Sequence, residues 1–211
     1  CVRSQGDIVC WGDNSLFQLG TNSGDPEPSI TLTDQVLQAP GGPGDYFSAD
    51  IEIGLGLNHG CSMTPHTYSG VWCWGGNTHH QAYANNRQPS RFAQRYLDRN
   101  AAMSKLAVGD NSACVSNVNP LTRPIANHHI RCWGDNRFGQ ANPSQTSGEP
   151  IKHINDATLI NALRNVEGIA LGSRHGCLHA GGVVQCWGDG RTGRLGKGFD
   201  PIWEPGPPPG R

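Results

Sequence analysis

A five-residue phrase built on Cys-Trp-Gly occurs four times in this chain and constrains its fold more than any other feature. The copies begin at Cys10, Cys73, Cys132 and Cys186 and read CWGDN, CWGGN, CWGDN and CWGDG. A second cue follows each copy, at residues 17–20, 81–84, 139–142 and 193–196, and reads FQLG, QAYA, GQAN and GRLG. The tryptophans of the phrase, at positions 11, 74, 133 and 187, are 63, 59 and 54 residues apart. This period is typical of propellers and repeat arrays, so one repeat domain of four imperfect units is predicted.

A second cysteine stands upstream of each phrase, and the eight cysteines predict four disulfides, one per repeat. The expected pairs are Cys1–Cys10, Cys61–Cys73, Cys114–Cys132 and Cys177–Cys186. In the first and last repeats a glycine-containing turn separates two short apolar runs, which predicts a β-hairpin whose facing cysteines a disulfide can span. Zinc is disfavoured because no C-x-x-C knuckle occurs. Four disulfides predict an oxidising compartment, and hence a secreted, extracellular protein.

Charge and composition exclude several classes of protein. Sixteen Lys and Arg residues against 17 Asp and Glu give a net charge of −1, too little to recruit nucleic acid or an anionic membrane. No apolar run approaches the roughly 18 residues of a membrane span. No nucleophile stands in a recognisable motif with a base, and no phosphate-cradling loop occurs. We therefore predict no enzymatic activity, no cofactor and no metal site.

Apolar segments that end in glycine precede three of the hairpins, at 51–56, 105–109 and 168–172, and each predicts a strand. The first repeat has no such strand; its place would precede Cys1. The repeats are placed at about 1–20, 51–84, 104–142 and 168–199. In the connections between them, 30–36 is a strand candidate, and 91–97 and 157–163 are expected to form two helical turns each. The Pro/Gly-rich tail, 200–211, is expected to be extended and held by this chain or a neighbour.

The order of these cues is similar to the repeat of the regulator of chromosome condensation family. The cues are a strand, Gly-x-x-His-[Gly/Ala]-Cys, a hairpin, Val-x-Cys-Trp-Gly-Asp-Asn and Gly-Gln-Leu-Gly, and they resemble most the cysteine-containing extracellular members, described as alpha-tubulin suppressor-like. The resemblance covers all four repeats and about half of the residues. It implies an all-β propeller-type array of about four blades, each a four-stranded antiparallel sheet. A complete ring has seven blades, so the array is open or part of a larger ring.

The resemblance and the positions of residues within the repeats together suggest the roles of single residues. Nuclear members of the family exchange nucleotide on a small GTPase and dock on chromatin, which paired cysteines and near-zero charge speak against here. The four phrase tryptophans, Trp11, Trp74, Trp133 and Trp187, are predicted to be packing wedges in the repeat core. His59 and His175 share one repeat position and are predicted to be structural. Without the first strand, the sheet has an edge with unpaired backbone N–H and C=O groups. We expect a strand from a further part of the polypeptide or from a neighbouring copy to pair with this edge.

The main functional hypothesis is a non-enzymatic extracellular structural subunit that self-assembles into a filament or surface layer through open blade edges. The candidate assembly contacts are Val2, Ile8, Trp203, Pro207, Pro208 and Pro209. One alternative is a secreted protein-binding or inhibitor module that uses one propeller face, with Tyr46, Phe47, Tyr68 and Trp72 at exposed loop tips. Another is a glycan-binding, lectin-like propeller. The expected partner is a second copy or another extracellular protein, with no nucleic acid and no membrane span.

Overall fold

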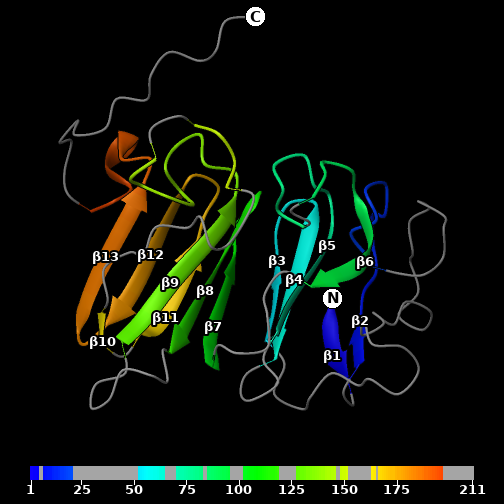
Figure 1. Ribbon diagram of the computed structural model, residues 1–211, viewed down its shortest axis with the longest axis horizontal. Coiled ribbons are helices and arrows are strands. Elements are labelled where there is room, and N and C mark those ends of the chain that lie inside the picture. Colours follow the sequence, from blue (N-terminus) through cyan, green and yellow to red (C-terminus); the bar gives the residue numbers. More distant parts are fainter. Residues whose placement is uncertain are drawn as a thin grey trace, which may run out of the picture.

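The computed structural model is built of antiparallel β-sheets (Figure 1). The structure describes residues 1–4, 7–20, 52–64, 70–82, 85–95, 102–118, 127–145, 148–151, 163–164 and 166–196. Within these ranges the only helix is a single 3-10 turn, η2 (Arg191–Gly193). The predicted all-β class is confirmed. No helix in this described part of the chain is long and apolar enough to cross a membrane.

Four sheets follow one another in chain order, and we number them sheets 1 to 4. Sheet 1 contains β1 (Val2–Ser4) and β2 (Asp7–Val9). Sheet 2 contains β3 (Glu52–Leu55), β4 (His59–Thr64), β5 (Gly70–Gly75) and β6 (Ser90–Arg95). Sheet 3 contains β7 (Ala102–Val108), β8 (Ser112–Val118), β9 (Asn127–Gly134) and β10 (Leu163–Arg164). Sheet 4 contains β11 (Val166–Leu171), β12 (His175–Ala180) and β13 (Val183–Gly188). Strands adjacent in sequence are hydrogen-bonded neighbours in every sheet, as expected of hairpins joined in series.

The hairpin registers bring the two cysteines of each repeat together. Cys61 faces Cys73, Cys114 faces Cys132 and Cys177 faces Cys186 across neighbouring strands. The structure joins these pairs, and Cys1 with Cys10, as four disulfides with Cα–Cα distances of 3.9 to 4.1 Å. The hairpin loops, at 65–69 and 119–126, differ in length while the cysteines keep their register. The disulfides therefore hold four hairpins of one kind, with no cross-link between repeats.

One expected helix is instead a strand. Residues 90–95 form β6, which pairs with β5 through Trp72 opposite Arg95 and Cys73 opposite Gln94. A helix of two turns is marginal by itself, whereas the edge of β5 offers a row of backbone partners, so the strand is favoured. Leu163, expected at the end of a second helix, lies in β10 and pairs with His128. The rest of that segment, the strand candidate at 30–36 and the tail at 200–211 lie outside the described residues.

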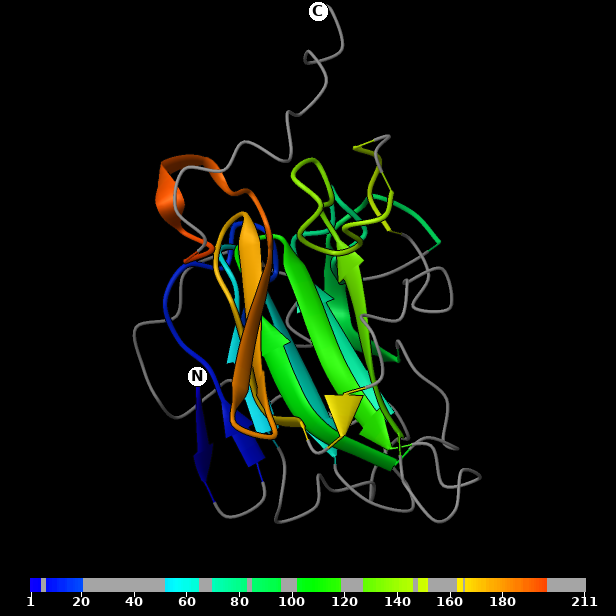
Figure 2. The ribbon, with the colours of Figure 1, turned by 90° about the vertical axis from the view of Figure 1, so that its left-hand side faces the viewer.

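The sheets stand next to one another, with β3, β7 and β11 side by side where sheets 2, 3 and 4 meet (Figures 1 and 2). Glycine permits this close approach: a Cβ atom built on Gly109 would lie 2.5 Å from the carbonyl oxygen of Gly172. A carboxylate oxygen of Glu52 also accepts a bond of 2.8 Å from the backbone N–H of Leu106. One apolar cluster joins sheets 2, 3 and 4, and a smaller one joins sheets 1 and 2. The segments that follow β5, β9 and β13 all lie at the upper end in Figure 1.

Candidate binding surfaces

A tryptophan from each of sheets 2, 3 and 4 bonds to the preceding repeat. The indole N–H of Trp74 donates to the backbone oxygen of Gln18 at 2.9 Å, that of Trp133 to Gln81 at 3.0 Å, and that of Trp187 to Gln140 at 2.8 Å. All three indoles are buried. Burial of a large ring combined with a bond from its polar N–H is the usual way in which tryptophan fills an interface. Each of the three therefore fastens one sheet to the sheet before it.

The glutamine that accepts this bond sits in a turn that recurs in the chain. A backbone bond closes the turn in every repeat, from Phe17 to Asn14, His80 to Asn77, Gly139 to Asn136 and Gly193 to Gly190. In the first three repeats the asparagine side chain also accepts a backbone N–H five residues on, and the glutamine side chain accepts one two residues back. Sequence reasoning missed this role of the glutamine. The signal that could have found it is its constant offset of seven residues from the tryptophan.

Trp11 departs from its predicted place in the core. Its side chain is 41% exposed, and no acceptor for its N–H is found among the described residues. The other three tryptophans bond to the repeat before their own, whereas no described residue covers Trp11. The same residue type therefore meets a buried site in sheets 2 to 4 and solvent in sheet 1.

On the opposite side of the array, in sheet 4, an apolar residue is exposed whose equivalents in the other repeats are buried. The apolar residue two positions before the second cysteine is Ile8, Val71, Ile130 and Val184 in the four repeats. The first three are at most 1% exposed, whereas Val184 is 66% exposed. In the first three repeats the following sheet covers this position, and no described residue covers it in sheet 4. Ile8 is thus no assembly contact, contrary to the prediction, because it packs in the cluster that contains Trp74.

These observations define two outward-facing sheet surfaces. The leading face belongs to sheet 1 and the trailing face to sheet 4. Val2 lies opposite Val9, two residues before Trp11, so the leading face consists of Val2, Val9 and Trp11. The register of β11, β12 and β13 places the following residues on one side of sheet 4, and they form the trailing face: Ala170, Cys177, His179, Val184 and Cys186.

Other predicted contact residues are placed differently or not described. Trp72, expected at an exposed loop tip, lies in β5 and packs against the cluster that contains Ile8. Its position inside a sheet, opposite Ser62 and Arg95, explains why it is partly buried. The remaining predicted contacts lie outside the described residues: Tyr46, Phe47, Tyr68, Trp203, Pro207, Pro208 and Pro209.

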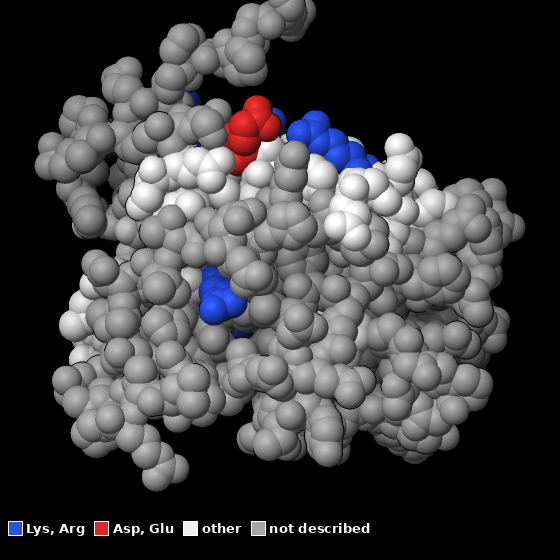
Figure 3. Space-filling model, viewed as in Figure 1, with Lys and Arg blue, Asp and Glu red and all other residues white. Residues whose placement is uncertain are grey.

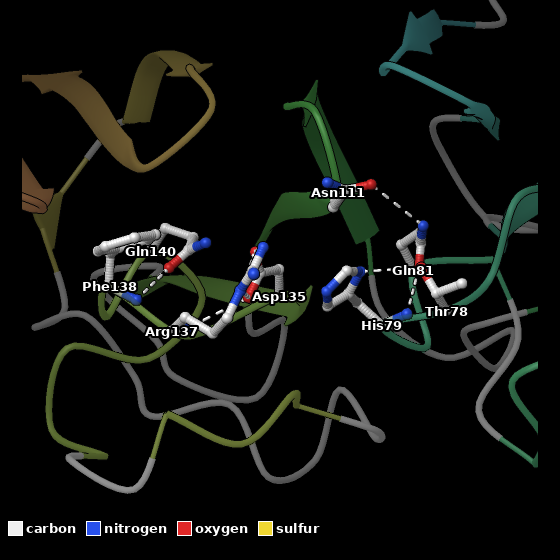
Figure 4. A network of polar contacts seen from close by, with 8 residues as sticks. All are labelled: Thr78, His79, Gln81, Asn111, Asp135, Arg137, Phe138 and Gln140. Atoms are coloured by element: carbon white, nitrogen blue, oxygen red, sulfur yellow. Dashed lines mark hydrogen bonds and ion pairs between the residues drawn. The ribbon is translucent and has the colours of Figure 1, made fainter. Parts of the chain in front are cut away.

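A hydroxyl, an imidazole and a carboxylate meet where sheets 2 and 3 join (Figure 4). The Thr78 hydroxyl lies 3.0 Å from Nδ1 of His79, but the carboxylate of Asp135 is engaged by three bonds from the Arg137 guanidinium. Burial lowers the pKa of His79, against the opposing charge of Asp135, so the ring is neutral near pH 7. With its carboxylate engaged elsewhere, this constellation lacks the orienting acid of a catalytic triad.

The buried histidine of sheet 2 has a structural setting. Burial lowers the pKa of His59 from 6.5 to about 4, and the backbone of Asp110 opposes this only in part. The ring packs against Gly56, and neither nitrogen reaches a hydrogen bond of good geometry. No group of three His, Cys, Asp or Glu side chains among the residues described is arranged to hold a metal ion.

No protein-family model and no curated protein matches this sequence. Solved structures do resemble its fold. The crystal structure of human WBSCR16 matches 88% of this chain and 43% of its own length, with a TM-score of 0.64 and 16% identity. Yeast RCC1 (Prp20) bound to Kap60 matches 90% of this chain and 41% of its own, with a TM-score of 0.62 and 17% identity.

Prp20p from Saccharomyces cerevisiae, characterised together with its binding to Gsp1p and histones, gives a TM-score of 0.62 at 18% identity. That match covers 93% of this chain and 44% of Prp20p. The chain thus spans less than half the length of each of these solved structures. At such low identity the likeness shows the fold alone, which is that of the RCC1-type β-propeller.

Proposed function

We propose that this chain is a non-enzymatic, extracellular protein-binding array that associates with further copies of itself through its leading and trailing faces. One observation carries the proposal: Trp11 on one face and Val184 on the other are exposed, whereas the residues at the same positions of the other repeats are buried between sheets. The two faces are the two halves of a packing that the chain uses three times internally. Exposed apolar faces of this kind mark interaction sites.

The chemistry of the two faces is complementary. In each internal contact a tryptophan enters from one side, and a disulfide with a buried branched residue lies on the other. A second copy that presents Trp11 to the trailing face would repeat this packing against Val184 and the Cys177–Cys186 disulfide. The carbonyl oxygen of Arg194 occupies the place of the glutamine acceptor, and no described residue donates to it. A contact between unlike faces builds a ring if its rotation closes and a filament if it does not.

The setting of this assembly follows from the cysteines. All eight are paired in the structure, and such a disulfide framework persists in oxidising compartments outside the cell. Because a disulfide closes each hairpin, the array is suited to a lasting structural role. Binding of protein through the sheet surfaces requires no chemistry of the chain's own.

The test uses lysine substitutions on the two faces. W11K and V184K each place a charge in the proposed contact, and each is expected to keep the protein monomeric by light scattering at concentrations where the wild type assembles. A mixture of the two variants retains one intact pair of faces, so it should form a dimer of one W11K and one V184K molecule. Leu57, which is 64% exposed at the turn between β3 and β4, provides the control: L57K should assemble as the wild type does.

Two results would overturn the proposal. The first is that the wild type stays monomeric over the whole concentration range, which is expected if further blades of the same polypeptide cover both faces. The second is that L57K impairs assembly as strongly as W11K does. Assembly would then be driven by any exposed apolar side chain and not by the contact between the leading and trailing faces.

A further inference from the structure

Two arginines lie against one aromatic ring where the segments that follow sheets 3 and 4 meet, and two more arginines are held by carboxylates of the same segments. The guanidinium carbon of Arg174 lies 4.6 Å from the ring centroid of Phe138, and that of Arg191 lies 5.1 Å from it. Arg137 precedes Phe138 in the chain, and Arg194 belongs to the same loop as Arg191. We call this set the arginine platform: Arg137, Phe138, Arg174, Arg191 and Arg194. Figure 3 shows basic side chains at the upper rim of the molecule, with an acidic side chain between them.

Buried carboxylates fix three of these arginines. Asp135, with its side chain 4% exposed, binds Arg137 at 2.7 Å, and Asp189, 2% exposed, binds Arg191 at 2.8 Å and Arg194 at 3.3 Å. The Arg137 and Arg191 side chains are nevertheless 57% and 49% exposed. Each of these two guanidinium groups donates to its carboxylate through Nε and one terminal nitrogen. The remaining N–H donors of the guanidinium group can therefore bind another acceptor. Arginine held in this way loses less side-chain entropy when it binds a ligand.

The platform carries excess positive charge. Burial raises the pKa of Asp135, but the bonds from Arg137 outweigh this effect and leave the pKa below its usual value. Hydrogen bonds from Arg191 likewise lower the pKa of Asp189, so both carboxylates are ionised near pH 7. Two negative charges then face four positive ones. No described carboxylate pairs with Arg174, and even with the exposed Glu149 of the neighbouring segment included, the balance stays positive.

The fold does not require these arginines. Asp13 occupies the same repeat position as Asp135 and Asp189, and its carboxylate is satisfied by Ser15 and Gln18 alone. In repeat 2 the position is Gly76. The turn and the tryptophan bond form in these repeats without any guanidinium, so turn formation alone does not account for the platform.

We propose that the arginine platform binds an acidic segment of a partner protein, through Asp or Glu carboxylates. The planar guanidinium fork matches a carboxylate with two parallel bonds, and pairs of this kind are among the stronger polar contacts. Two guanidinium groups already lie against the Phe138 ring, so a nucleobase would have to compete with them for it. The chain as a whole has a net charge of −1, which is too little to recruit nucleic acid. Arg194 belongs to both proposals, but through different groups: its backbone oxygen is the proposed acceptor for Trp11 of a second copy, whereas its guanidinium group pairs with Asp189 in the platform. The binding of an acidic segment therefore does not require self-association.

The test is fluorescence anisotropy with a labelled oligoglutamate peptide at low ionic strength, on the intact disulfide-bonded chain. The wild type should bind this peptide and not an oligoglutamine peptide, and the affinity should fall as salt screens the charges. R174Q removes the guanidinium that no described carboxylate pairs, and should weaken binding about tenfold, as expected for one lost bond to a charged group. R87Q, which removes an exposed arginine of repeat 2, is the matched control and should bind as the wild type does.

A second variant guards against loss of fold. R137K retains the charge but lacks the fork, and should weaken oligoglutamate binding while the circular dichroism spectrum is unchanged. The proposal is wrong if R174Q binds the peptide as the wild type does, if R87Q is equally impaired, or if a single-stranded oligonucleotide of equal charge binds as tightly as the peptide. W11K should bind it normally, so a failure of self-association leaves this test intact.

Discussion

Gly109 directly follows β7, at the point where the ends of β7 and β11 approach each other closely, and this approach leaves no room for a larger residue. In G109A the new methyl group would lie 2.5 Å from the carbonyl oxygen of Gly172 and 3.1 Å from Cβ of Leu171. Ordinary contact begins at 3.4 Å, so the two strands must separate by about 0.9 Å. The oxygen belongs to the backbone and cannot rotate away. Overpacking of this kind costs about 1–3 kcal/mol, and we expect the free energy of unfolding to fall by that amount.

The measurement is urea denaturation under non-reducing conditions, followed by tryptophan fluorescence, because Trp133 and Trp187 lie in the sheets that would part. Gly168 supplies the matched control: it lies within β11, and no atom lies within 4 Å of a Cβ built there. G168A should leave stability unchanged or raise it by up to about 1 kcal/mol, since alanine restricts the unfolded chain. Equal losses in G109A and G168A would refute the reasoning, because they would show that the approach of the strands is not the cause.

Three further predictions concern the repeats. W133F leaves a buried backbone oxygen without its donor and should destabilise the protein by about 1–3 kcal/mol, whereas W11F should change the free energy of unfolding by no more than about 0.5 kcal/mol; equal effects in denaturation would contradict the role of the indole bond. G190N restores the asparagine of the other repeats and should raise the Tm by adding a bond worth about 0.5–1.5 kcal/mol; an unchanged or lower Tm would speak against it. Because the folded-state pKa of His59 is about 4, the unfolded state binds the extra proton below pH 6.5. Stability should therefore fall between pH 6.5 and 4, by up to about 1.4 kcal/mol per pH unit, and the slope in H59S should be flatter, or the histidine is not responsible.

The exposed tryptophan and valine show where sequence reasoning reached its limit. Trp11 and Trp133 stand in the same five-residue phrase, and nothing local separates them. Likewise Val184 and Val71 precede a cysteine at the same offset. Their burial differs because, among the residues that the structure describes, a neighbouring sheet packs against Trp133 and Val71 but not against Trp11 and Val184. The strand β6 is a further feature that the local sequence does not reveal. Its own pattern predicted a helix, but pairing with β5, which is separated from it in sequence, favours the strand.

The arginine platform was also beyond the reach of the sequence. Phe138 and Arg174 are distant in the chain and meet only in the folded protein. A bond from the backbone N–H of Asp189 to the carbonyl oxygen of Arg174 also brings the loop that follows β13 to the turn between β11 and β12. The Asp-x-Arg spacing is visible in repeats 3 and 4, yet a carboxylate in a turn is ordinary. Only the burial of the two carboxylates and the exposure of their partners reveal fixed guanidinium groups.

The sequence by itself determined the four hairpins, their disulfides and the all-β class, because each follows from cues a few residues apart: a turn, two short apolar runs and a cysteine on either side. Tertiary structure decided which face of each hairpin is covered, which tryptophan finds an acceptor and which charged loops meet. These properties depend on the neighbouring sheet and on the order in which the repeats stack. Identical local sequences therefore fold alike and yet differ in burial and in the contacts they can offer.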